Sequence, residues 1–431
     1  MGRQLGLRLR LWWWSAFWAL PVLGLLLGLG LVSLTGLADD ALYGELQRSV
    51  FSATASATVF AAIGGGMITF TGFVFSFVLL ILQFGSSQYS PRTVSYFLGA
   101  RLTQAILAVF LATVAFSFSA LIYVGVDGRE DYSGDASVLV AMMLLMLSLI
   151  GFVTLLHTTG SRVRVDRVLT AFGRAAVERL PHRFLTPPNP RVQTQRPPPP
   201  GPDPEKLRSL RYQGDSGQLV ALDTAALMRL ARRHGSYLRM RVRVGDAVAH
   251  GATVAVTMSA RGEHTARFER AISRCLVVAV ERSLRHDPLY ALRLLVDVAI
   301  RALSAAVNDP TTAVRALDEI ERVLRAAAPL PLGPVAYIKG PGTLELQPPS
   351  WKDCCDLAWT EIIECGSDQP QVTRRLTAMF EDLLADLPAD RQAAIAEFDC
   401  ALRRSACRNF DAESLSGALV PDRQGLGGSR Y

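Results

Sequence analysis

Residues 54–84 read TASATVFAAIGGGMITFTGFVFSFVLLILQF and hold no charged side chain. A transmembrane helix needs about 20 mostly apolar residues, so this stretch is long enough to cross a bilayer. Three more apolar stretches of sufficient length lie at 11–37, 102–126 and 137–157. The sequence therefore predicts a domain of four transmembrane helices within residues 1–160.

The composition of the 431-residue chain agrees with an apolar part followed by a polar part. Hydrophobic residues make up 50% of the chain, and its mean hydropathy is +0.25, whereas a soluble protein of this length would normally fall below zero. The formal net charge of +7 suits a protein that lies beside anionic lipid. The basic residues are not gathered in one run, so we expect no nucleic-acid partner.

Charges in the loops predict how the spans are oriented. The N-terminus, the loop between spans two and three and the segment after span four carry Arg3, Arg8, Arg10, Arg92, Arg101, Arg162, Arg164 and Arg167. The two other loops are mainly acidic and carry Asp39, Asp40, Glu45, Asp127, Glu130, Asp131 and Asp135. Because arginine-rich loops stay in the cytoplasm, we expect a multi-pass protein of the bacterial inner (plasma) membrane with both termini cytoplasmic. A cleaved signal peptide ending near residues 36–38 is an alternative for span one and leaves the topology unchanged.

Span two has more small residues than an anchor needs. The candidate positions for a helix seam or a pore lining are Gly64, Gly65, Gly66, Thr69, Gly72 and Ser76. Small residues let helix backbones approach closely in lipid, which predicts a tight seam between helices. Uncharged hydroxyls and exposed carbonyls would equally suit a pore-lining segment. No span has an acidic or basic residue at its middle, which argues against a proton relay.

The polar segment that ends span two is a candidate cytoplasmic mouth. It contains Gln83, Ser86, Ser87, Gln88, Ser90 and Arg92. A short interfacial helix leading into span three and the lining of a pore vestibule both remain open.

Residues 161–186 predict an amphipathic juxtamembrane helix. Its basic side chains are Arg162, Arg164, Arg167, Arg174 and Arg179. A helix of this kind directly after a span is expected to lie along the inner leaflet and to bind anionic lipid headgroups. The proline-rich stretch at 187–204 then predicts an extended linker.

The residues after the linker predict an α+β cytoplasmic domain. A small β-rich subdomain is expected over 205–260, where Gly245-Asp246-Ala247-Val248-Ala249-His250-Gly251 is similar to the turn of barrel-sandwich carrier domains. Those carriers attach a cofactor to a lysine, and none lies between Lys206 and Lys339. We therefore expect no carrier role and no cofactor.

Residues 261–410 predict a helical subdomain that includes a β-hairpin near 335–346, and the tail at 411–431 is expected to be disordered. Asp287-Pro288 and Asp309-Pro310 each predict the start of a helix, since Asp is favoured at the N-cap and Pro at the first helical position. The candidate ligand or interface residues are Asp287, Arg293, Asp297, Arg301, Asn308 and Asp309. Simple helix capping is the alternative reading of these polar residues.

Nothing in the sequence predicts catalysis or a metal site. The six cysteines form no CxxC or CxxH pattern, so we expect no metal. No HExxH, P-loop or Ser/His/Asp order is found, so we expect no enzyme.

The chain resembles the bacterial predicted-membrane-protein family known as domain of unknown function 2254. The resemblance rests on Gly66-Met67-Ile68-Thr69, the 83–92 segment, Asp287-Pro288-Leu289-Tyr290 and Asn308-Asp309-Pro310-Thr311-Thr312. The chain departs from the expected pattern at Ala305, where a proline is expected after Ser304. The resemblance implies a membrane protein with a cytoplasmic domain and brings no established activity.

Two functions follow from these patterns. One is a homo-oligomeric channel or pore with a cytoplasmic regulatory domain, based on the composition of span two. The other is a membrane-anchored sensor or scaffold whose helical domain binds a ligand or partner.

Overall fold

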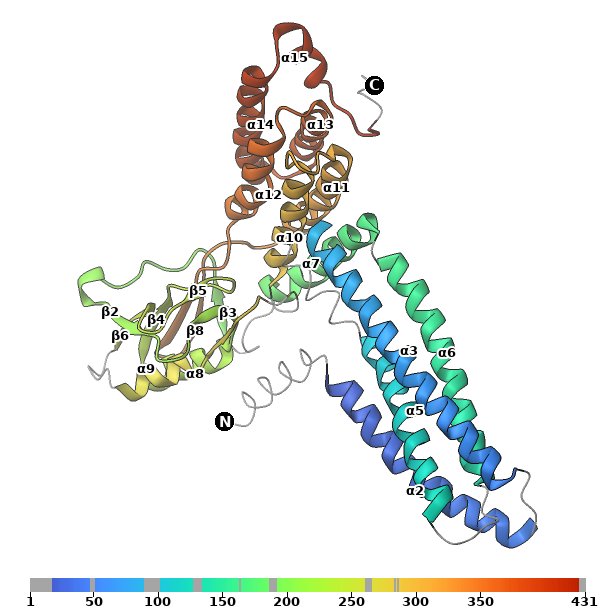
Figure 1. Ribbon diagram of the computed structural model, residues 1–431. Coiled ribbons are helices and arrows are strands. Elements are labelled where there is room, and N and C mark those ends of the chain that lie inside the picture. Colours follow the sequence, from blue (N-terminus) through green and yellow to red (C-terminus); the bar gives the residue numbers. More distant parts are fainter. Residues whose placement is uncertain are drawn as a thin grey trace. The chain divides into compact units, whose positions relative to one another are not determined.

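The computed structural model describes residues 18–46, 51–88, 101–126, 134–162, 164–185, 192–259, 266–282, 284 and 287–425. The chain divides into two compact units, residues 1–164 and 165–431, here called the membrane unit and the C-terminal unit. Figure 1 shows long helices alone in the first, and strands with shorter helices in the second.

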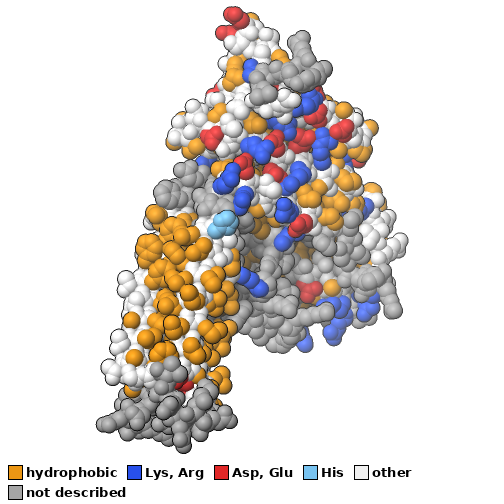
Figure 2. Space-filling view, turned by 90° about the vertical axis from the view of Figure 1, so that its right-hand side faces the viewer, with side chains coloured by type: hydrophobic (Ala, Val, Ile, Leu, Met, Phe, Trp, Pro, Cys, Tyr) orange, Lys and Arg blue, Asp and Glu red, His pale blue; other side chains and the backbone are white. Residues whose placement is uncertain are grey.

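The membrane unit confirms the predicted helical spans. Its helices are α2 (Ala19–Leu46), α3 (Ala53–Gln88), α5 (Arg101–Val126) and α6 (Asp135–Arg162). All four are long and apolar enough to cross a membrane. Helix α5 packs against each of the other three (Figure 1), and its Phe110 and Phe116 are fully buried. Figure 2 shows hydrophobic side chains over the exposed surface of this unit, whereas charged side chains gather on the C-terminal unit.

Helix α2 meets α5 through two glycines. A Cβ on Gly28 would lie 2.9 Å from the Cα of Ala112, and a Cβ on Gly24 would lie 2.7 Å from the Cα of Ala108. Glycine at these two positions, one turn apart, lets the backbones approach closely. The predicted seam on span two differs from this arrangement, since only Gly64 among its candidate glycines faces a neighbour, the ring of Phe118 at 3.1 Å.

Asp39, an acidic residue expected in a loop, caps another helix. The Asp39 carboxylate on α2 accepts hydrogen bonds from the backbone N–H of Ala136 (2.6 Å) and from the hydroxyl of Ser137 (2.6 Å). These donors belong to the first turn of α6, whose free N–H groups favour a carboxylate. Asp39 therefore ties α2 to the start of α6.

The C-terminal unit begins with α7 (Val165–Leu185), which joins a helical bundle. Helix α7 packs against α10 (Pro288–Ala302) and α11 (Pro310–Ala327). Its buried apolar residues are Val168, Leu169, Phe172, Ala176 and Leu180. The prediction of an interfacial helix was wrong in this respect, because the apolar face that would enter the lipid is covered by protein.

The sheets draw their strands from distant parts of the chain. The strands are β1 (Gln193–Gln195), β2 (Arg208–Arg211), β3 (Gly217–Leu222), β4 (Ser236–Met240), β5 (Ala247–Val248), β6 (Thr253–Ser259), β7 (Leu276–Ala279), β8 (Val335–Lys339) and β9 (Gly342–Leu346). They form a six-stranded sheet of order β1-β8-β9-β4-β6-β2 and a three-stranded sheet of order β5-β3-β7. All pairs are antiparallel except β4 with β9. Helices α8 (Thr224–His234) and α9 (Ala266–Ser273) contribute to the core of these sheets.

The predicted subdomain boundaries differ from this topology. Strand β1 lies within the predicted linker and pairs with β8, with Gln193 opposite Ile338. Strands β7, β8 and β9 come from the region assigned to the helical part. The reason is that strand pairing is non-local: the β8–β9 hairpin begins 95 residues after the end of β4, yet β9 pairs with β4 and so extends the sheet at its open edge.

The remaining helices are α12 (Trp351–Gly366), α13 (Pro370–Asp386), α14 (Ala389–Asn409), α15 (Ala412–Ala418) and the short 3₁₀ turn η2 (Pro204–Lys206). The fully buried Trp359 contacts Phe380 and Phe398, with ring centroids 4.9 and 5.3 Å away. The tail predicted to be disordered forms α15 and continues to residue 425. It is held by Arg374, which donates to the carbonyl of Gly417, so partners distant in sequence order it.

Candidate functional site

One face of α3 is built from small residues. Thr58, Ala62, Gly65, Thr69, Gly72 and Ser76 recur at alternating spacings of four and three residues. This spacing places them on a single narrow stripe of the helix, here called the small-residue face. All six residues are exposed in the membrane unit, and a Cβ on Gly65 or Gly72 would meet no atom within 4 Å.

Four of the six predicted span-two residues lie on this face. Gly66 is exposed beside it, and Gly64 is buried on the side that meets α5. The hydroxyls of the face are satisfied within the helix. Ser76 donates to the carbonyl of Gly72 at 3.0 Å and Thr69 donates to that of Gly65 at 3.4 Å.

The predicted cytoplasmic mouth is described only in part. Gln83 is exposed near the end of α3. Ser86, Ser87 and Gln88 belong to the last turn of α3, but their side chains lie outside the described part, as does that of Arg162. Ser90 and Arg92 lie outside the described residues.

The candidate residues between 287 and 309 occupy separate places. Asp287 is the N-cap of α10 and is only 4% exposed; its Oδ1 accepts from the backbone N–H of Tyr290 and its Oδ2 from Arg282 at 2.5 Å. Arg282 also lies over the ring of Tyr290, 5.0 Å from its centroid. A Cβ on Gly245 would lie 2.5 Å from the Arg282 guanidinium, so the predicted 245–251 turn abuts this pair. Gly245 adopts φ +101°, which favours glycine.

Arg293 and Asp297 form a second group with α12. The Arg293 guanidinium donates to Asp297 at 2.6 Å and to both carboxylate oxygens of Glu361 at 2.6 and 2.8 Å. These bonds raise the pKa of Arg293, and the bond to Glu361 has the largest effect. The group is a link between α10 and α12, and Arg301 is exposed beyond it.

Asn308 and Asp309 form a local turn. Asn308 has φ +48°, and Asp309 is the N-cap of α11, where it accepts from the backbone N–H of Thr312 at 3.0 Å. The six candidate residues therefore do not converge on one site.

The two Asp-Pro caps should differ in their effect on stability. Asp287→Ala removes a cap and a nearly buried partner of Arg282. We therefore expect the free energy of opening of α10 to fall by about 2–3 kcal/mol. Asp309→Ala removes a cap alone and should cost about 1 kcal/mol in α11. Hydrogen exchange of the α10 and α11 amides in the full-length protein measures both. Equal losses would contradict a stabilising role for the Arg282 pair.

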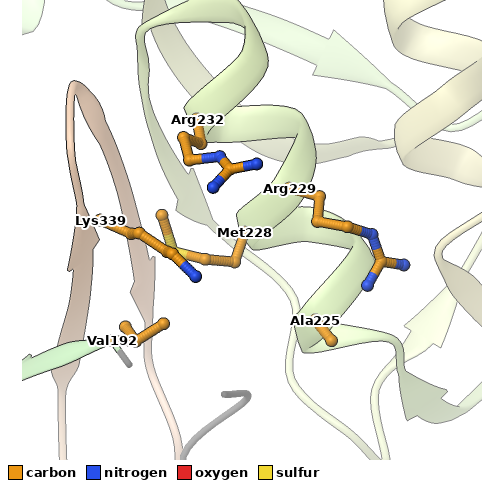
Figure 3. A pocket seen from close by; sticks show the side chains of 6 residues that line it. All are labelled: Val192, Ala225, Met228, Arg229, Arg232 and Lys339. Carbon is orange, nitrogen blue, oxygen red and sulfur yellow. The ribbon is translucent and has the colours of Figure 1, made fainter. Parts of the chain in front are cut away.

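A cavity that the sequence patterns did not indicate lies beside α8. Its volume is about 150 Å³, and it is lined by Val192, Ala225, Met228, Arg229, Arg232 and Lys339 (Figure 3). Helix α8 contains three arginines and no acidic residue, which was the one signal available in the sequence. Lys339 comes from a strand 105 residues beyond the end of α8, so only the fold brings it to this place.

Comparison with known proteins agrees with this architecture. Residues 14–382 match the family described as predicted membrane protein (DUF2254). Uncharacterized proteins of Mycobacterium bovis and Mycobacterium tuberculosis are 28% identical over 411 residues, which cover 93% of this chain and 78% of each relative. No solved structure matches the chain. The chain therefore belongs to the DUF2254 family of predicted membrane proteins.

Proposed function

We propose that this protein is a homo-oligomeric pore of the bacterial inner membrane in which the small-residue faces of α3 meet around a common axis. Its termini would lie in the cytoplasm, as the loop charges predict. The C-terminal unit would then be a cytoplasmic regulatory domain. The observation that carries the proposal is the exposure of the small-residue face.

The other exposed helix faces of the membrane unit are unlike this one. On α6 the exposed residues include Met143, Ile150 and Val153, and on α2 they include Leu26 and Leu34. Large apolar side chains of this kind suit lipid. A stripe of glycine, alanine, threonine and serine suits close approach by another helix, because association in lipid depends on tight backbone packing.

The chemistry of the face also suits a pore. It carries no charge over its whole length, and its hydroxyl oxygens, whose protons are donated within the helix, keep lone pairs that can contact water or a cation. The spacing of four and three residues favours left-handed packing between copies of α3. Each copy would then present the same stripe to the axis, as closed symmetry requires.

Single-channel recording of the purified full-length protein in planar bilayers tests the pore directly. Light scattering in detergent reports the number of copies. We expect a stable oligomer that conducts. A monomer, or an oligomer that passes no current under voltage or membrane tension, would overturn the proposal.

A matched pair of substitutions tests the contact surface. Gly72→Leu places a large side chain on the small-residue face, and we expect the equilibrium constant for assembly to fall at least tenfold, which corresponds to about 1.4 kcal/mol. Gly30→Leu makes the same change at an exposed glycine of α2 with no neighbour within 4 Å and should leave that constant unchanged. If both variants assemble like the wild type, the small-residue face is not the contact surface.

A further inference from the structure

Three cationic side chains surround the cavity beside α8. Arg229 and Arg232 project from neighbouring turns of α8, and Lys339 comes from the end of β8, alongside Met228 (Figure 3). The Arg229 guanidinium is directed away from the other two cations. Within the described part of the chain, none of these three cations makes an ion pair. Residues 186–191, which precede Val192, contain no acidic residue either.

Other arginines of the same unit are neutralised by carboxylates. Arg239 pairs with Glu345 at 2.8 Å, and Arg282 pairs with Asp287 at 2.5 Å. Three like charges around one small cavity repel each other, and a bound anion would remove that repulsion. The cavity therefore gathers three cations that no carboxylate of the described residues neutralises.

The remaining lining of the cavity is apolar. Met228 is only 3% exposed, and Val192 and Ala225 complete the wall. One water needs about 10–15 Å³ of such space, so a cavity of about 150 Å³ has room for a phosphate group and part of an attached organic group. A site with cations at its mouth and an apolar wall fits an anion that carries an apolar portion.

We propose that this cavity binds an organic phosphate with two or more negative charges. Its phosphate oxygens would contact Arg232 and Lys339, because arginine binds phosphate through paired N–H donors and lysine acts as a point charge. Arg229 would add positive charge to the same cavity. Its organic portion would lie against Met228 and Val192. The chemistry is the same for a soluble nucleotide and for a phospholipid headgroup. The inference does not depend on the proposed pore, because the two rest on different units of the chain.

Calorimetric titration of the full-length protein in nonionic detergent tests the site. The soluble probes are ADP and pyrophosphate. The lipid probe is short-chain phosphatidic acid, with short-chain phosphatidylcholine, a zwitterion of zero net charge, as its counterpart. We expect at least one of the three anionic probes to bind and phosphatidylcholine not to bind. Binding by ADP or pyrophosphate identifies a soluble ligand, and binding by phosphatidic acid alone identifies a lipid headgroup.

A charge-matched pair of double variants locates the binding. Arg232→Gln with Lys339→Gln removes two cations of the cavity, and we expect affinity to fall at least tenfold. Arg208→Gln with Arg211→Gln removes two exposed cations from β2, at the opposite edge of the same sheet, and should change affinity less than twofold. Equal loss in both pairs would reveal unspecific attraction to positive charge and overturn the proposal, as would failure of every probe to bind.

Two substitutions of Ala225 distinguish the effect of charge from the effect of side-chain volume. Ala225→Glu places a carboxylate in the cavity wall, four residues before Arg229 and therefore on the same face of α8. Ala225→Gln adds nearly the same volume without charge. We expect the glutamate variant to bind at least fivefold more weakly than the glutamine variant. Equal affinities would show that the three cations do not bind the ligand.

Discussion

Gly28→Leu should prevent the membrane unit from folding correctly. A Cβ at this position would lie 2.9 Å from the Cα and 3.0 Å from the carbonyl carbon of Ala112. These are backbone atoms of α5 and cannot rotate away, so the two helices must separate. Overpacking of a core costs about 1–3 kcal/mol and sometimes more. Here the separation would also disturb the hydrogen bonds that link Asp39 to the start of α6.

Gly30→Leu is the control for this prediction. It lies on the same helix, half a turn further along, and a Cβ there would meet nothing within 4 Å. The wild type and this variant should be recovered from membranes in equal amounts and should resist trypsin equally in detergent. We expect Gly28→Leu to be recovered at less than a tenth of that amount, or to be digested within the spans. Equal recovery and resistance of the two variants would contradict close packing of α2 on α5.

Arg375→Met should lower the free energy of opening of the helical bundle in the C-terminal unit by about 3 kcal/mol or more. The Arg375 guanidinium on α13 donates to Glu321 at 2.5 Å and to Asp318 at 2.8 Å, both on α11. The side chains of Arg375 and Glu321 are only 11% and 12% exposed. Removing one partner of a buried ion pair costs about 3–5 kcal/mol, because the remaining charge stays desolvated. Glu321 keeps Arg325 at 2.7 Å, so we expect the lower end of this range.

Arg423→Met is the matched control. Arg423 also pairs with two carboxylates, Asp382 at 2.6 Å and Glu381 at 3.5 Å, but it is 48% exposed. Exposed pairs contribute about 0–1 kcal/mol. Hydrogen exchange of the α11 and α13 amides in the full-length protein reports both changes locally, which avoids assuming that two units unfold together. A loss as small for Arg375 as for Arg423 would show that water reaches the buried pair.

Several elements could be predicted because their causes lie in neighbouring residues. Asp223, Asp287 and Asp309 each cap the helix that follows them, as Asp before a helical segment predicts. The turn at 340–342 predicts the hairpin of β8 and β9, and Gly340 there adopts φ +57°. Amphipathic periodicity also identified the faces of α10 and α11 that are buried.

Other features could not be predicted because they depend on which element of the fold packs against a given helix face. The sequence marks both Gly24 and Gly65 as small residues in an apolar helix, yet only Gly24 meets a neighbouring backbone. The apolar face of α7 has the same periodicity whether lipid or protein covers it. The sequence alone places Asp39 in a loop, because its contact with the first turn of α6 forms only in the folded chain.

The sequence by itself determined the four spans, the helix starts and the family, because hydropathy, capping and motif are properties of contiguous residues. The tertiary structure decided which small-residue stripe stays exposed on α3, which strands complete the six-stranded sheet, and which cations surround the cavity beside α8. Each of these joins residues far apart in the chain, and the free energy of such contacts depends on the surface that each element finds opposite it.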